Sequence, residues 1–184
     1  MQRSKIPAAL ARAIKLVILD VDGVLTDNGV YIGQTERGEH VEMKRFDILD
    51  GLGIKMLVRG GVQVAFVSGR ISNASALRAL ELGVECHQAD AGYKMAACRE
   101  LMQKHAVAWQ EIAWVGDDLP DMATMRQVGL PIAVANAVSA IKDVAAYVTS
   151  RRGGDGAVRE FAEELLRARG QWQKLAEEYV SERS

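Results

Sequence analysis

The stretch Lys15–Asp27, with the sequence KLVILDVDGVLTD, constrains the fold of this chain more than any other. Its aliphatic run, Leu16–Leu19, ends abruptly at Asp20, and Asp22 follows two residues later. A short aliphatic run bounded by charge and glycine is typical of a strand that is buried on both faces, as in parallel sheets. A loop with two solvated acids is the plainer alternative. In a strand, side chains two residues apart leave on the same side, so the two carboxylates would converge and need a cation.

From Gly51 onward the sequence alternates between helix patterns and buried-strand patterns. Before that point, Val30–Ile32 and His40–Lys44 flank a polar tip and predict a β-hairpin. The expected helices are 52–59, 72–81, 93–105, 119–127, 138–143 and one from 156 to beyond 173, and the expected strands are 62–67, 84–87, 112–115, 131–135 and 147–149. Short connections between such units favour an α/β fold in which helices flank a parallel, Rossmann-like sheet.

We expect one domain over residues 1–184, because no internal repeat, low-complexity tract or change of composition marks a boundary. The hairpin forms a small insert at 24–46, and residues 151–184 form a glycine-rich tail and the C-terminal helix. The stretch between the first strand and Val62 holds only the hairpin and one helix. We therefore expect no large cap domain.

Composition argues against several classes of function. The 184 residues carry a formal net charge of -1, which gives no basic surface for nucleic acid. No apolar run approaches the roughly 18–20 residues of a membrane-spanning helix, and the N-terminus lacks the apolar segment of a signal peptide. The two cysteines, Cys86 and Cys98, are too few for a disulfide framework. The sequence thus predicts a cytoplasmic protein with no nucleic-acid or membrane partner.

Polar residues stand at four predicted element ends, in an order that ordinary turns do not require. In chain order, the four segments are Asp20–Asp22, Ser68–Arg70, Lys94 and Gly116–Asp121. Ligands of open α/β sheets bind beyond the carboxyl ends of the strands, where these segments would meet. In type and order the segments resemble the four motifs of the haloacid dehalogenase (HAD) superfamily of phosphatases.

Within that superfamily the chain resembles the family of 3-deoxy-D-manno-octulosonate 8-phosphate (Kdo 8-phosphate) phosphatases. The segments that carry this resemblance are 20–26, 46–57, 67–70, 116–121 and 152–160. The resemblance implies Mg²⁺-dependent hydrolysis of Kdo 8-phosphate to Kdo and phosphate through an aspartyl-phosphate intermediate. The reaction would belong to the synthesis of lipopolysaccharide precursors.

The resemblance also implies catalytic and metal-binding roles. Asp20 is the expected nucleophile, and Asp22 is the expected general acid and then the general base. The expected Mg²⁺ ligands are the carboxylates of Asp20 and Asp117 and the main-chain carbonyl of Asp22. Oxygen ligands of this kind suit Mg²⁺, which would neutralise a phosphomonoester before an anionic nucleophile approaches it.

Further residues are expected to bind the phosphoryl group and the sugar. Ser68 can hydrogen-bond to a phosphoryl oxygen, and Lys94 can place a positive charge on it and hold Asp20 ionised. The residues that the resemblance assigns to substrate are Asp47, Asp50, Gly51, Lys55, Arg70, Arg78 and Asp118. Asp121 is expected to support the metal site from behind.

Each substrate-binding assignment has a plainer alternative. Arginine forks match carboxylates such as the one at C1 of Kdo, but Arg78 alone is equally a solvated helix residue. The segment 47–51 is otherwise a loop with a helix cap, and Asp118 is otherwise the cap of the next helix. These assignments therefore depend on the resemblance.

Other functions stay open. One is a phosphatase for another acidic sugar phosphate, such as a nonulosonate 9-phosphate, although enzymes of that group tend to carry glutamate where Arg70 stands. Another is a catalytically silent tetramerisation scaffold. Loss of Asp20, Asp22 or Lys94 would indicate such a scaffold, and all three are present. A dehalogenase lacks the second aspartate of the first motif, and phosphomutases generally carry a substantial cap domain.

The expected partner is a small acidic sugar phosphate. The resemblance further implies a homotetramer in which the hairpin and the glycine-rich C-terminal tail contact neighbouring active sites. A lid borrowed in this way would control access of water to the phosphoenzyme in a protein that lacks its own large cap.

Overall fold

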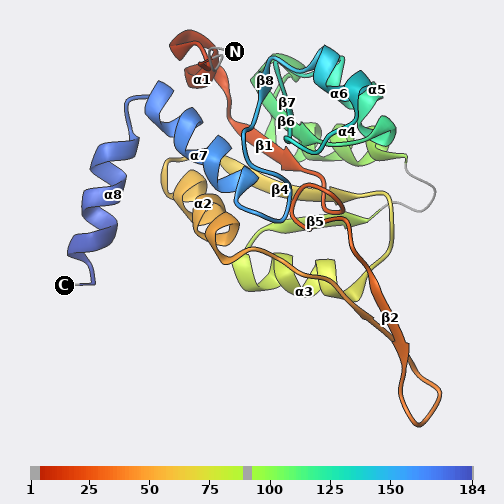
Figure 1. Ribbon diagram of the computed structural model, residues 1–184. Coiled ribbons are helices and arrows are strands. Elements are labelled where there is room, and N and C mark those ends of the chain that lie inside the picture. Colours follow the sequence, from red (N-terminus) through yellow and green to blue (C-terminus); the bar gives the residue numbers. More distant parts are fainter. Residues whose placement is uncertain (1–4, 89–92, 184) are drawn as a thin grey trace.

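The computed structural model describes residues 5–88 and 93–183, so that residues 1–4, 89–92 and 184 of the expected domain lie outside it. Six parallel strands form one sheet between two groups of helices (Figure 1). In sheet order the strands are β5 (Glu85–Gln88), β4 (Gln63–Ser68), β1 (Leu16–Leu19), β6 (Ile112–Gly116), β7 (Leu130–Ala133) and β8 (Tyr147–Val148). The predicted α/β fold with a parallel sheet is confirmed.

Helices cover both faces of the sheet. The helices are α1 (Ala8–Ala13), α2 (Ile48–Arg59), α3 (Asn73–Leu82), α4 (Lys94–His105), α5 (Met122–Met125), α6 (Ser139–Val144), α7 (Ala157–Ala168) and α8 (Trp172–Ser181), with 3₁₀ turns η2 (Trp109–Glu111) and η3 (Leu119–Asp121). Figure 1 shows α2 beside α7, on the side of the sheet opposite to α4, α5 and α6. Within the described ranges, none of the helices has the length and apolarity needed to span a membrane.

The central strand β1 positions the site. It pairs with β4 on one side and β6 on the other, so Leu19 lies level with Phe66 and Val115. Every side chain of β1 is fully buried, which explains its unbroken aliphatic sequence. Because the chain runs to β4 on one side and later to β6 on the other, the carboxyl end of β1 is a switch point where ligands bind.

The predicted hairpin is present as a separate two-stranded ribbon. Its strands β2 (Tyr31–Gln34) and β3 (His40–Met43) pair antiparallel and project away from the sheet (Figure 1). Apolar side chains of the ribbon are open to solvent, with Ile32 69% exposed and Met43 60% exposed. A ribbon of this size has too little core to be stable alone.

Two predicted helices differ from the structure. The helix expected at 119–127 is a 3₁₀ turn followed by the single-turn helix α5, and the C-terminal helix expected from 156 onward is divided into α7 and α8. The break comes at Gly170, whose φ of 75° is favourable for glycine and ends the helix. Beyond it, Trp172 lies against the guanidinium groups of Arg159 and Arg167. The Cζ atoms of these arginines are 5.2 and 5.4 Å from the centroid of the Trp172 ring.

Asp50 joins the first turn of α2 to the start of α7. Its Oδ1 accepts a hydrogen bond from the backbone N–H of Arg159 at 2.8 Å, and only 1% of the residue is exposed. Burial raises the pKa of Asp50 from 3.8 to about 6, against the opposing effect of the backbone hydrogen bond from Arg159. The ionised carboxylate is therefore costly in the folded protein.

We expect Asp50→Asn to gain stability relative to the wild-type protein as the pH rises. Because the folded pKa exceeds the unfolded one, Asp50 favours folding below about pH 4, and this contribution is lost as the pH rises through about 6. Asparagine keeps an acceptor but cannot ionise, so the difference in unfolding free energy should shift in its favour by up to about 3 kcal/mol. Urea unfolding at acidic and at neutral pH measures this shift. Asp50→Ala, which has no acceptor, should be less stable than Asp50→Asn at both; a pH-independent difference between Asp50→Asn and wild type would contradict the prediction.

Candidate active site

Asp20 and Asp22 lie in a tight loop that follows β1. The backbone N–H of Leu25 returns to the carbonyl of Val21 at 2.9 Å, and Gly23 has a φ of 87° that glycine adopts without strain. Asp20 is 5% exposed, whereas Asp22 lies nearer the surface, with 19% of its side chain exposed. The loop thus places one carboxylate at the sheet edge and the other above it.

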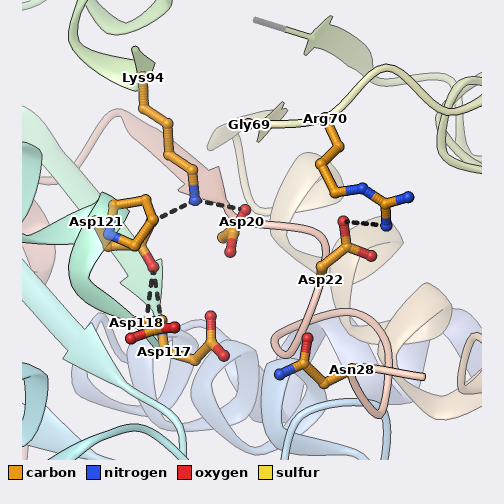
Figure 2. Close-up of a pocket in the computed structure, with 10 residues that line it drawn as sticks. Asp20, Asp22, Asn28, Gly69, Arg70, Lys94, Asp117, Asp118 and Asp121 are labelled. Atoms are coloured by element: carbon orange, nitrogen blue, oxygen red, sulfur yellow. Dashed lines mark hydrogen bonds and ion pairs between the residues drawn. The ribbon is translucent and has the colours of Figure 1, made fainter. Parts of the chain in front are cut away.

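Lys94 connects the first and fourth motifs. Its Nζ lies 2.7 Å from Oδ1 of Asp20 and 2.7 Å from Oδ1 of Asp121, and the lysine side chain is 4% exposed (Figure 2). Lys94 begins α4, which follows β5 in the chain, and is far in sequence from both Asp20 and Asp121. Only the fold brings these three residues together. The contact brings the positive charge of Lys94 to the Asp20 carboxylate.

Asp121 is held from several directions. Its Oδ1 accepts hydrogen bonds from Lys94 and from the indole N–H of Trp114, at 2.7 and 3.1 Å. Its Oδ2 accepts from the backbone N–H groups of Asp117 and Asp118, at 2.9 and 3.3 Å. Both oxygens are thereby occupied, which suits a residue that orients the loop after β6 better than a metal ligand.

Asp20, Asp117 and Asp121 form a compact carboxylate cluster. One oxygen of each lies within 4.8 Å of the others, and all three residues are buried. The Asp117 carboxylate approaches the backbone of Gly23 so closely that a side chain at position 23 would overlap it. The carboxylate oxygens of Asp20 and Asp117 are hard donors that fit Mg²⁺, and Asp121 lies beside them with both of its oxygens occupied.

The electrostatics of the cluster also fit a cation. Burial, followed by the charge of Asp121, raises the pKa of Asp20 well above its usual value, with Lys94 opposing. Burial and the charge of Asp121 raise the pKa of Asp117 to about 6. Lys94 supplies one positive charge for three carboxylates, so a divalent ion would stabilise their ionised forms.

A pocket opens directly above the cluster. Figure 2 shows Arg70 extending to Asp22 on one side of the pocket, opposite Lys94 and Asp121. The residues that line the pocket are Asp20, Asp22, Asn28, Gly69, Arg70, Lys94, Asp117, Asp118, Pro120 and Asp121. Predicted residues of all four motifs therefore meet in one place.

Ser68 ends β4 next to the pocket. It is 1% exposed, and its hydroxyl donates to the carbonyl of Arg70 at 3.0 Å and accepts from the Arg70 N–H at 3.1 Å. Among the described lining residues, its neighbours Gly69 and Arg70 are present and Ser68 is not. A role for its hydroxyl toward phosphate stays a prediction.

The predicted substrate-binding residues fall into two groups. Arg70 and Asp118 line the pocket, and Asp118 also caps η3 by accepting from the Leu119 N–H at 2.7 Å. Of the pocket-lining residues within the described ranges, none belongs to the second group, which consists of Asp47, Asp50, Gly51, Lys55 and Arg78. Their assignment to substrate stays a prediction.

The second group lies on and around the start of α2. Asp47 caps this helix through the Leu49 N–H at 2.6 Å, and its carbonyl accepts from Nη2 of Arg78 at 3.1 Å. The Arg78 guanidinium also packs against Gly51, where a side chain would overlap it. Lys55 is exposed on the same helix. Within a single chain, Asp47, Gly51 and Arg78 thus have structural partners.

A clamp of glycines holds the Asp20–Asp22 loop from the C-terminal side, and sequence patterns did not predict it. The Asn136 side chain donates to the carbonyl of Gly23 at 3.1 Å and accepts from the Gly153 N–H at 2.6 Å. The Gly154 N–H donates to the carbonyl of Val24 at 3.0 Å. The close backbone approach explains the paired glycines, which sequence reasoning interpreted as a linker or lid.

We expect Gly153→Ala to lower the free energy of unfolding and to slow turnover. The new methyl group would overlap the carbonyl oxygen of Gly23 and press on Val24, so the loop must move. Overpacking against backbone should cost about 3 kcal/mol. Urea unfolding and phosphate release measure the two effects. Gly33→Ala, whose methyl would meet nothing within 4 Å, should keep wild-type stability; equal stability of both variants would contradict the clamp.

The fold and the site define a class of protein. A parallel sheet with Asp-x-Asp after its central strand, a buried lysine and a third aspartate after β6 is the arrangement of a haloacid dehalogenase-type hydrolase. Residues 89–161 match the family described as haloacid dehalogenase-like hydrolase.

Relatives narrow this class. The 3-deoxy-D-manno-octulosonate 8-phosphate phosphatase KdsC of Escherichia coli K12 is 41% identical over 162 residues, which cover 88% of this chain and 84% of the relative. The phosphatase of the same name from Moraxella catarrhalis, solved in complex with magnesium ion, phosphate ion and KDO molecule, aligns with a TM-score of 0.85. It is 34% identical and covers 94% of this chain and 97% of its own. The chain belongs to the family of Kdo 8-phosphate phosphatases within the haloacid dehalogenase-like hydrolases.

Proposed function

We propose that this chain is a Mg²⁺-dependent phosphatase that hydrolyses Kdo 8-phosphate to Kdo and phosphate, a step that supplies Kdo for lipopolysaccharide precursors. The observation that carries the proposal is the contact of Lys94 with both Asp20 and Asp121 beneath a pocket that Asp22 and Arg70 also line. The identity to the E. coli phosphatase supports the choice of substrate.

In the proposed reaction, Asp20 and Asp22 divide the chemistry. An oxygen of Asp20 attacks phosphorus, the bond from phosphorus to the sugar oxygen breaks, and Asp22 gives its proton to that leaving oxygen. Water then attacks the aspartyl-phosphate, Asp22 takes the proton back, and phosphate and the Asp20 carboxylate are released. The position of the partly exposed Asp22 above the buried Asp20 supports this division.

Asp20 and Asp117 would hold Mg²⁺ through their carboxylates, with the main-chain carbonyl of Asp22 as a third ligand. When bound, the ion neutralises negative charge on the phosphoryl group and within the carboxylate cluster. Lys94 favours the ionised form of Asp20, against burial and the charge of Asp121, and Asp121 orients the loop that carries Asp117. Ser68 would hydrogen-bond to the phosphoryl group after turning away from Arg70.

Arg70 is the proposed partner of the substrate carboxylate. It stands at the pocket mouth with 47% of its side chain exposed, and its guanidinium reaches Glu42 at 3.1 Å. Asp118 would contact substrate hydroxyls from the opposite side of the pocket. Asp47, Asp50, Gly51, Lys55 and Arg78 would also contribute to substrate binding.

The proposed assembly is a cytoplasmic homotetramer of single-domain chains. The exposed apolar side chains of the hairpin, including Tyr31, Ile32 and Met43, support its packing on a neighbouring copy. The glycine-rich tail at 151–156 would help to close the active site of a neighbouring copy. Equilibrium sedimentation measures the assembly.

Substrate profiling tests the proposed function. Phosphate release would be followed from Kdo 8-phosphate, a nonulosonate 9-phosphate and glucose 6-phosphate, each with Mg²⁺ and with a chelator. The expected kcat/KM for Kdo 8-phosphate exceeds that of the others by about 100-fold or more, and the chelator abolishes it. Comparable kcat/KM for all three would overturn the substrate. No turnover of any of them by folded, Mg²⁺-loaded protein would favour a silent scaffold.

A further inference from the structure

Lys44 has a buried side chain at the base of the hairpin. It follows β3 directly, and none of its side chain is exposed to solvent. Burying an ammonium group is costly unless negative charges and hydrogen-bond acceptors surround it. A lysine in this position therefore needs an explanation from its contacts.

The contacts of Lys44 join three segments of the chain. Its Nζ lies 2.7 and 3.0 Å from the two carboxylate oxygens of Asp22, in the loop after β1. It also donates to the hydroxyl of Ser75 on α3 at 3.2 Å, and Glu42 of β3 lies 3.8 Å away. Ser75 is itself fully buried, so its contact fixes the position of the Lys44 ammonium group.

The position of the Lys44 ammonium group determines where the Asp22 carboxylate lies. Lys44 donates a hydrogen bond to Oδ2 of Asp22 and forms an ion pair with Oδ1, whereas Nη1 of Arg70, also near Asp22, lies 3.9 Å from Oδ2. Without Lys44, the remaining attraction would draw the carboxylate toward Arg70 and the pocket mouth. A displacement of about 1 Å in a reacting group can cost about 100-fold in rate.

We propose that Lys44 is a positioning residue for Asp22, so that the base of the hairpin belongs to the catalytic apparatus. The inference rests on the proposed phosphatase function, in which Asp22 donates a proton to the leaving oxygen. Lys44 does not contact the substrate; it acts by holding Asp22 between the loop and α3.

The leaving group distinguishes this role from a structural one. A sugar alkoxide needs a proton from Asp22 as it departs, whereas p-nitrophenolate departs without one. Lys44→Met keeps the length and burial of the side chain but removes the charge. With enzyme in excess and Mg²⁺ present, first-turnover rates would be measured for Kdo release from Kdo 8-phosphate and for nitrophenolate release from p-nitrophenyl phosphate.

We expect Lys44→Met to slow the first turnover of Kdo 8-phosphate by about 100-fold and that of p-nitrophenyl phosphate by less than about threefold. Lys174→Met, which changes a side chain that is 80% exposed on α8, should match wild type on both substrates. Equal slowing of both substrates by Lys44→Met, or wild-type rates on both, would overturn the proposal.

Two further measurements keep the test decisive. Calorimetric Mg²⁺ affinity should be unchanged in Lys44→Met, because Lys44 contacts the side-chain carboxylate of Asp22 and not the proposed ligand atoms, which are the Asp22 main-chain carbonyl and the carboxylates of Asp20 and Asp117; a large loss would show a general collapse of the site and contradict the proposal. If Lys44→Met does not fold, Ser75→Ala serves instead, because it removes one acceptor from the ammonium group. It should also slow the first turnover of Kdo 8-phosphate more than that of p-nitrophenyl phosphate, by a smaller factor than Lys44→Met. Failure of the proposed function itself would appear separately, as wild-type protein inactive on both substrates.

Discussion

Asp20→Asn is expected to release no measurable phosphate from Kdo 8-phosphate while remaining fully folded. An amide oxygen is a poor nucleophile, and loss of a covalent nucleophile lowers the rate by about 10⁴-fold or more. The variant should also be more stable than wild type without Mg²⁺, because burial and Asp121 disfavour the Asp20 carboxylate there. Phosphate release and urea unfolding measure both effects.

The matched control for this variant is Asp143→Asn. Asp143 is an exposed aspartate on α6, outside the pocket, so its variant should keep the wild-type rate. A rate for Asp20→Asn within about tenfold of wild type would exclude Asp20 as the nucleophile.

Lys94→Met is the variant with the second-largest expected effect, and it should lose both stability and activity. It removes the positive charge that lies 2.7 Å from both Asp20 and Asp121, inside a buried site. Breaking a buried ion pair on one side costs about 3–5 kcal/mol, because the carboxylates are left without their partner. Mg²⁺ should restore part of this stability, since the ion supplies positive charge to the same cluster. Urea unfolding with and without Mg²⁺ measures the loss and its recovery.

Lys104→Met provides the comparison within the same helix. Lys104 also lies on α4 and forms an ion pair with Glu85, but 62% of its side chain is exposed. A surface pair of this kind contributes little, so the variant should unfold like wild type. If Lys94→Met were as stable as Lys104→Met without Mg²⁺, the proposed role of Lys94 as counter-charge would be wrong.

The strand ends were the part of the site that sequence patterns predicted well. Asp20, Lys94 and Asp117 follow or begin elements with strong local patterns, and a parallel sheet brings such ends to one edge. Their convergence is therefore a consequence of topology. Asp121 accepts hydrogen bonds from four donors, which no spacing rule identifies, and its supporting role stays a prediction.

Contacts between distant segments could not be predicted in this way. Lys44 stands in a strand-like stretch of alternating residues, and only the packing of the hairpin base against α3 shows that it reaches Asp22. The contact of Gly153 with Gly23 likewise joins segments that are far apart in sequence. Sequence periodicity is local, so it carries no information on such pairs.

The C-terminal helices illustrate a different difficulty. Helical spacing of apolar residues continues across Gly170, so the pattern predicted one helix where α7 and α8 are separate. A glycine within a helical pattern is often tolerated. Here the packing of Trp172 back onto Arg159 favours two separate helices. Tertiary contacts, rather than local preference, fix this boundary.

Chemical trapping of the phosphorylated residue tests the central claim most directly. The protein would be quenched during turnover of Kdo 8-phosphate with Mg²⁺ and reduced with borohydride, which converts an aspartyl-phosphate to homoserine. Peptide mass spectrometry then identifies the modified position. Homoserine at position 20, absent without substrate, is the predicted result. Homoserine at the position of Asp22 or Asp117, or none at all in protein that is turning over substrate, would contradict a mechanism in which Asp20 carries the phosphoryl group.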